Sequence, residues 1–222
     1  MDENGRTISP LAAILAVIAT FVLSLFLGAM ILILFGYPFA MISVELLLIV
    51  VPLGYMLHRR VDVRSYIGLR MKPRTVLLGV TLGGFLFLFN LVVSNILVSV
   101  FGVSEVIEES NTLIVNLSSS PQGLLSVIIA LSLAGICEEF TFRGFLQTAI
   151  NSRFSSSVAL LVSSIAFALL LHFDPQAVYT LSAFLIGVML GYIYYRCRSY
   201  IVPAVAHTTQ NLIVLIITLI IL

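Results

Sequence analysis

The sequence predicts an all-α fold: one integral membrane domain over residues 1–222, a polytopic bundle of about seven transmembrane helices with its N-terminus in the cytoplasm. The first observation is composition, since 60% of the residues are hydrophobic, 9% are charged and the mean hydropathy is +1.17. Soluble domains carry charge on about a quarter of their residues. The second observation is a series of long apolar runs, and the third is the one-sided placement of basic residues. Together they exclude a soluble globular protein and indicate a multi-pass integral membrane protein.

The apolar runs are long enough to cross a bilayer, which takes about 20 residues in a helix. The fifth and sixth are the shortest. Residues 58–75 form a cytoplasmic linker, in which Pro73 is suited to begin the third helix, and residues 102–123 form a loop on the outer side. In chain order the runs cover residues 10–35, 39–57, 76–101, 124–150, 157–173, 177–195 and 201–222.

The basic residues between the runs all fall on one side when the chain crosses the membrane seven times. Because cytoplasmic loops carry an excess of Lys and Arg, this side is the cytoplasm, and the C-terminus lies outside. The acidic residues Glu105, Glu108, Glu109 and Asp174 fall on the opposite side. The basic residues of the cytoplasmic side are Arg6, Arg59, Arg60, Arg64, Arg70, Lys72, Arg74, Arg153, Arg196 and Arg198.

The fourth run contains three charged residues, Glu138, Glu139 and Arg143. Each charge at bilayer depth costs roughly 2.5 to 3.5 kcal/mol on insertion scales, so their presence needs a reason. Glu139 and Arg143 are four residues apart and meet on one helix face, where their charges largely cancel. Glu138 is rotated by about 100° from Glu139 and cannot share the arginine equally well. We therefore predict that Glu138 has a functional partner elsewhere.

Three further polar residues lie at depth in later runs. His172 closes the fifth run, while His207 and Asn211 are four residues apart in the seventh and share a helical face. Helical rise places Glu138, His172 and Asn211 roughly 16 to 24 Å from their cytoplasmic turns, and His207 roughly 10 Å. We therefore expect these side chains to converge in one cavity that opens toward the cytoplasm. Glu45 in the second run has no assigned role.

A carboxylate, two imidazoles and a carboxamide around one cavity suit hydrolysis of a peptide bond. The carboxylate accepts a proton from water, and a nearby histidine shares that proton and later delivers it to the leaving amine. A second histidine and an asparagine amide can donate hydrogen bonds to the oxyanion, about 2.7 to 4 kcal/mol for one donor. No Ser or Cys nucleophile motif and no HExxH motif is present. We therefore expect water to be the nucleophile, with no metal and no other cofactor.

At these residues the sequence resembles the CAAX prenyl protease and bacteriocin-processing family, the intramembrane glutamate endopeptidases. The resemblance covers about residues 124–215 and rests on Glu138-Glu139-x-x-x-Arg143-Gly144-Phe145-Leu146 and on the stretch 187–211, which ends in His207-x-x-x-Asn211. The family usually shows Phe-x-x-x-His, whereas here Phe167 stands five residues before His172 and Ala168 takes the expected place.

The resemblance implies that Glu138 and His172 activate water, that Glu139 and Arg143 support the glutamate, and that His207 and Asn211 form the oxyanion hole. It also implies a membrane-associated peptide or protein as substrate, of which prenylated CAAX-type C-termini are the best-known kind in the family. The expected partners are thus this substrate and the lipid bilayer, with no nucleic acid.

Three other functions remain open from the sequence. The same fold could bind or scaffold a partner without catalysis. Carboxylates and histidines in membrane helices also relay protons, as in a proton-coupled transporter, although the chain lacks the matched half-repeats typical of many transporters. Because Glu and His are also metal ligands, a metalloprotease is the third alternative.

Overall fold

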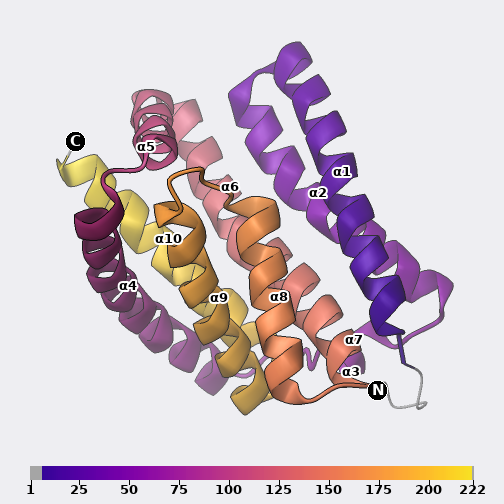
Figure 1. Ribbon diagram of the computed structural model, residues 1–222. Helices are drawn as coiled ribbons and strands as arrows, with labels where there is room; N and C mark the ends of the chain where they lie inside the picture. Colours follow the sequence, from indigo (N-terminus) through magenta and orange to yellow (C-terminus); the bar gives the residue numbers. More distant parts are fainter. Residues whose placement is uncertain (1–6, 222) are drawn as a thin grey trace.

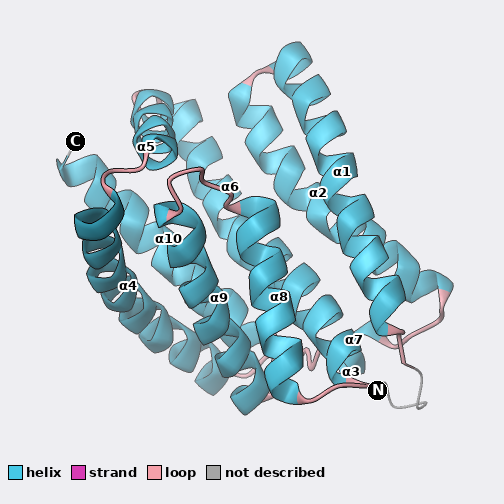
Figure 2. Cartoon of the chain, viewed as in Figure 1, coloured by secondary structure: helices cyan, strands magenta, loops and turns pink. Residues whose placement is uncertain are grey.

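The computed structural model describes residues 7–221, and within them every apolar run of the sequence forms helix (Figures 1 and 2). Arg6 and Leu222, which the sequence placed at the two ends of the bundle, lie outside the described residues. In chain order the helices are α1 (Pro10–Phe35), α2 (Tyr37–His58), α3 (Val63–Tyr66), α4 (Pro73–Phe101), α5 (Glu105–Ser118), α6 (Pro121–Glu139), the π-helix η1 (Phe140–Gln147), α7 (Thr148–Asn151), α8 (Ser156–Leu171), α9 (Val178–Cys197) and α10 (Ile201–Ile221).

The helix ends follow from local sequence signals. Ser9, Ser104, Ser120 and Ser155 each precede a helix, and each hydroxyl accepts a backbone N–H of the first turn. Such side-chain caps satisfy one of the N–H groups that a helix start leaves free. Gly36 ends α1 with a φ of 82°, a conformation that costs glycine little. The segmentation is therefore encoded mainly by serines, prolines and glycines at the boundaries.

The predicted all-helical membrane fold is confirmed. Among residues 7–221, the segments long and apolar enough to cross a membrane are six: α1, α2, α4, α6 with its continuation to Asn151, α9 and α10. The seventh, α8, is apolar but has only 16 residues. At 1.5 Å per residue it is about 24 Å long, shorter than the roughly 30 Å of a hydrocarbon core. In Figure 1 the α8–α9 connection lies below the α1–α2 turn and below the upper end of α6.

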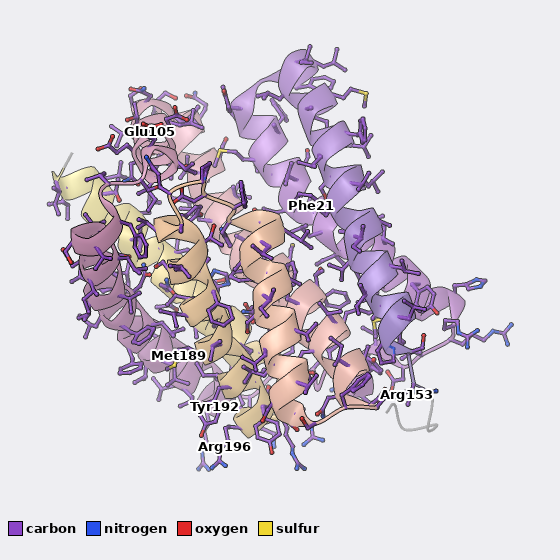
Figure 3. All side chains as sticks on the ribbon, in the orientation of Figure 1. Phe21, Glu105, Arg153, Met189, Tyr192 and Arg196 are labelled. Carbon is purple, nitrogen blue, oxygen red and sulfur yellow. The ribbon has the colours of Figure 1, made fainter. Side chains whose placement is uncertain are left out.

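The helices alternate in direction, so the two ends of the bundle differ in charge. In Figure 3, Arg153 and Arg196 lie at the lower end and Glu105 lies at the upper end. We name the lower end the arginine-rich end and the upper end the α5 end. The described basic residues of the arginine-rich end are Arg59, Arg60, Arg64, Arg70, Lys72, Arg74, Arg153, Arg196 and Arg198.

Two connections contain more structure than the sequence predicted. The linker 58–75 includes α3, and its residues Val61, Tyr66 and Ile67 are buried in the main hydrophobic core. The outer loop 102–123 contains α5, which has no buried residue. The first connection is thus part of the core, while the second is a helix lying on the bundle.

The fourth apolar run is not one continuous α-helix. It changes at Phe140 from α6 to the π-helix η1 and returns to an α-helix at Thr148. All eight residues of η1 are buried, and π-turns of this kind are often found at functional sites. The Thr141 hydroxyl donates to Leu48 O of α2 at 2.9 Å. This carbonyl has no helical donor because Pro52, four residues later, lacks an N–H.

Candidate active site

The Glu139–Arg143 ion pair lies at the centre of the bundle, in the turn where α6 becomes η1. Arg143 Nη1 is 2.8 Å from Glu139 Oε1, and both side chains are fully buried. Arg143 Nη2 donates to Gly187 O of α9 at 3.1 Å. Its guanidinium also lies 4.5 Å from the centre of the Phe167 ring. The arginine is therefore held on three sides, as its burial requires.

A second hydrogen bond, from Gln147, repeats the Arg143 contact one turn further along the chain. Gln147 Nε2 donates to Gly191 O at 3.0 Å. Gly187 and Gly191 allow this close approach, since a Cβ at Gly191 would lie 3.0 Å from Gln147 Oε1. The sequence analysis missed Gln147. The signal was its four-residue spacing from Arg143, which matches the spacing of the two glycines.

His207 of α10 links the two glutamates. Its Nδ1 is 3.2 Å from Glu139 Oε1, and its Nε2 is 3.8 Å from Glu138 Oε2. The longer distance exceeds a hydrogen bond. Oε2 of each glutamate is therefore buried without a hydrogen-bond partner, but Glu139 has a cation at its Oε1, Arg143, and Glu138 has none. Of the two carboxylates, Glu138 is the one without an arginine partner.

His172 is placed by the end of α8 and by Phe167. It caps α8 with its N–H on Ala168 O, and its ring is edge-on to the Phe167 ring with centroids 4.6 Å apart. The Phe167 ring is in turn 6.0 Å from that of His207. The five-residue spacing between Phe167 and His172 thus still gives ring contact, because His172 has left the helix.

Tyr179 and Asp174 fix the His172 ring from the α8–α9 connection. The Tyr179 hydroxyl is 3.0 Å from His172 Nδ1. The Asp174 carboxylate accepts the backbone N–H groups of Gln176 and Tyr179 at 3.0 and 2.9 Å. Burial alone would raise the pKa of Asp174, but these N–H donors outweigh it and hold the pKa below its usual value. Tyr179 was also missed, because a contact across a turn leaves no periodic signal.

Asn211 fastens α10 to α6. Its Nδ2 donates to Leu131 O at 3.3 Å, and the Thr208 hydroxyl donates to Ser132 O at 3.2 Å. Gly135 makes the approach possible, since a Cβ there would lie 2.3 Å from Thr208 Oγ1. One N–H of the Asn211 amide is therefore engaged by α6.

A cavity of about 490 Å³ lies beside the site residues of the C-terminal part of the chain. His172, His207 and Asn211 all line it. Its other walls come from the second half of α4, the first half of α9 and from α5. The cavity lies in the half of the bundle nearer the α5 end, whereas the sequence predicted a cavity that opens toward the cytoplasm.

Glu45 of α2 is a third acid beside the site. Its Oε2 is buried without a hydrogen-bond partner, and its carboxyl interacts electrostatically with Glu138. The sequence alone left its role open, because Glu45 lies near the outer end of its helix. Within residues 7–221, no three His, Cys, Asp or Glu side chains are grouped so as to hold a metal ion.

Comparison with known proteins gives one match. The family model described as Type II CAAX prenyl endopeptidase Rce1-like matches residues 120–213. The matched segment runs from the start of α6 into α10 and so includes Glu138, Glu139, Arg143, His172, His207 and Asn211. Neither the search of curated proteins nor that of solved structures gives a match.

Proposed function

From the match of residues 120–213 to the Rce1-like family model of type II CAAX prenyl endopeptidases, we propose that the chain is an intramembrane endopeptidase in which Glu138 and His172 activate water. The observation that supports the proposal most is that the two neighbouring glutamates differ in their ion-pair partners. Glu139 Oε1 is paired with Arg143 at 2.8 Å and with His207 at 3.2 Å, whereas the nearest basic group to Glu138 is His207 Nε2 at 3.8 Å from its Oε2, beyond a hydrogen bond. A buried carboxylate without a partner is costly unless it is used.

The reaction needs one water and one peptide bond. Glu138, helped by His172, takes a proton from water while the water oxygen attacks the carbonyl carbon of the peptide. With both ring nitrogens protonated, His207 donates Nδ1–H to Glu139 Oε1 and Nε2–H to the oxyanion, and the N–H of Asn211 that α6 does not engage is the second donor. The C–N bond then breaks, and the proton passes from the Glu138–His172 pair to the leaving amine. The products are a carboxylic acid and an amine.

In this proposal Glu139 and Arg143 do not react themselves, but hold the reacting side chains in place. The ion pair holds His207 through Glu139 Oε1 at 3.2 Å, and it holds α9 through the Gly187 carbonyl. Phe167 contacts Arg143 on one side and His172 on the other. These contacts keep the two histidines in register with Glu138.

The test is cleavage of a farnesylated CAAX peptide, and of the same peptide without the prenyl group, by the purified protein in proteoliposomes. Glu138→Gln keeps the shape of the side chain but cannot accept the proton, so we expect cleavage to fall by about 10² to 10⁴-fold. Glu108→Gln on the exposed face of α5 is the matched control and should cleave as the parent does.

Two results would contradict the proposal. One is undiminished cleavage by Glu138→Gln, and the other is failure of the parent to cleave either peptide, which would favour a binding or scaffolding role. Inhibition by a strong chelator, reversed by a divalent metal, would instead point to a metalloprotease.

A further inference from the structure

We infer that the cavity is entered from the α5 end, so that the peptide it takes is presented on the extracytoplasmic side of the membrane. As a statement about substrate this rests on the proposed function, but the sidedness of the cavity does not. Three independent observations support it. They are the charges at the two ends of the bundle, the closed arginine-rich end, and helix α5, which covers the cavity at the opposite end.

The charges orient the bundle. The described basic residues other than Arg143 all lie at the arginine-rich end, whereas residues 102–123 carry Glu105, Glu108 and Glu109 and no basic residue. Short loops rich in Lys and Arg stay in the cytoplasm during insertion. The arginine-rich end therefore faces the cytoplasm, and the α5 end faces outward.

The cytoplasmic end is closed by the linker between α2 and α4. Ile67 is 2% exposed, and a Cβ at Gly144 of η1 would lie 3.1 Å from its side chain. Its carbonyl accepts the Tyr194 hydroxyl at 3.3 Å, and Gly68 O accepts the Tyr200 N–H at 3.3 Å. A Cβ at Gly68 would lie 2.7 Å from Arg198 O. The linker is thus in direct contact with η1, α9 and the start of α10, and these contacts cover the arginine-rich end beneath η1.

At the opposite end, the cavity is covered by α5, a helix with few buried contacts. Ile107, Ser110, Asn111 and Ile114 of α5 line the cavity, yet no residue of α5 is buried. A side-chain bond from α5 to the α8–α9 connection runs from the Glu105 N–H to Gln176 Oε1 at 2.7 Å. Elements with few buried contacts open at low free energy. Displacement of α5 therefore gives access to His172 and His207 from outside.

The lining also limits the peptide that fits. Apart from its two histidines, the cavity has no ionisable acid or base except Tyr179, and its polar groups are neutral amides and hydroxyls. Ser182 donates to Asn90 Oδ1 at 2.7 Å, and Gln210 Oε1 is buried without a partner. An unpaired buried acceptor costs about 1 to 3 kcal/mol, which a backbone N–H of a bound peptide would remove. The fitting ligand is an apolar, uncharged peptide segment.

Cysteine accessibility tests the entry side without relying on catalysis. Val214→Cys places a thiol on the cavity wall one turn beyond Asn211, in a Cys197→Ser background. The native Cys197 at the arginine-rich end is the matched control for the other side, and Cys137 is buried. Each protein is exposed to a charged, membrane-impermeant maleimide in right-side-out and in inside-out vesicles.

We expect Val214→Cys to be modified in right-side-out vesicles and Cys197 only in inside-out vesicles. Modification of Val214→Cys only from the inside-out side, from both sides, or from neither while a permeant maleimide does react, would overturn the inference. The proposed function fails separately: correct labelling together with no peptide cleavage would leave the entry side supported and remove the protease assignment.

Discussion

Arg143 of η1 contacts residues of three other helices, α6, α8 and α9, at the centre of the site. It pairs with Glu139, donates to Gly187 O and lies over the Phe167 ring, all within a fully buried environment. Removing one partner of a buried ion pair leaves an uncompensated charge, which costs more than removing both. The pair is therefore a structural requirement whatever the reaction is.

We predict that Arg143→Met lowers the free energy of unfolding by about 3 to 5 kcal/mol, because Glu139 is left buried without its cation. Glu139→Gln together with Arg143→Met should be less destabilised than Arg143→Met alone. Thermal unfolding of the purified variants in detergent measures both. A double variant as unstable as the sum of the two single variants would show that the side chains act independently.

At the scale of single residues, the sequence predicted which charged side chains pair within one helix. It did not predict hydrogen bonds between helices. Glu139 and Arg143 could be paired from their spacing, because a helix fixes which side chains meet. Gln147 and Tyr179 could not be found this way, since their partners are Gly191 O and His172 on other segments. Asn211 was expected to face the reaction, and its contact with Leu131 O depends on how α10 meets α6.

At the scale of elements, glycines decide how closely α10 approaches its neighbours. A Cβ at Gly135 of α6 would lie 2.5 Å from the backbone nitrogen of Thr208, and one at Gly83 of α4 would lie 2.6 Å from Ala206 O. Both contacts flank His207. The position of the histidine is thus set by small residues on two other helices.

Gly83 and Gly84 form a matched pair that tests this. A Cβ at Gly84 would meet nothing within 4 Å, so Gly84→Ala should be neutral or stabilising by up to about 1 kcal/mol from helix propensity. Gly83→Ala should destabilise by about 1 to 3 kcal/mol, because α10 must shift. Thermal unfolding checks the stabilities. Equal stabilities for the two variants would mean that α10 is not held closely by α4.

Element lengths were predicted well, and element types less well. Hydrophobic runs located every membrane helix and the unusual shortness of α8. The change from α6 to η1 at Phe140 was not predicted, because composition does not distinguish the two hydrogen-bond patterns. The amphipathic α5 was taken for a loop, since its three acids masked the apolar residues Ile107 and Ile114.

At the scale of the whole molecule, the linker between α2 and α4 belongs to the core. Val61, Tyr66 and Ile67 are buried in the same hydrophobic cluster as Phe142, Phe145 and Leu146 of η1. The basic residues around them were predicted as ordinary topology-determining charges, and the alternation of buried and charged positions explains why the apolar ones were overlooked. The N-terminal third is therefore joined to the segment that carries the site.

We predict that Ile67→Ala lowers the free energy of unfolding by about 2 to 5 kcal/mol, the usual cost of a cavity in a packed core. Leu57→Ala is the control, because Leu57 is 61% exposed near the same end; its effect should stay within about 0.5 kcal/mol. If both variants unfold at the temperature of the parent, the linker does not contribute to the core.

The shortness of α8 has a consequence for the surrounding lipid. Leu161, Ile165 and Leu169 of α8 are exposed to the acyl chains, but the helix stops at Leu171 and Phe173 follows it at 65% exposure. A span that falls about 6 Å short of the hydrocarbon thickness is accommodated by local thinning of the bilayer. Such thinning would bring headgroups and their hydration shell closer to His172, which follows the last residue of α8. If the chain is the protease we propose, its water could come from this thinned leaflet, without a pore through the protein.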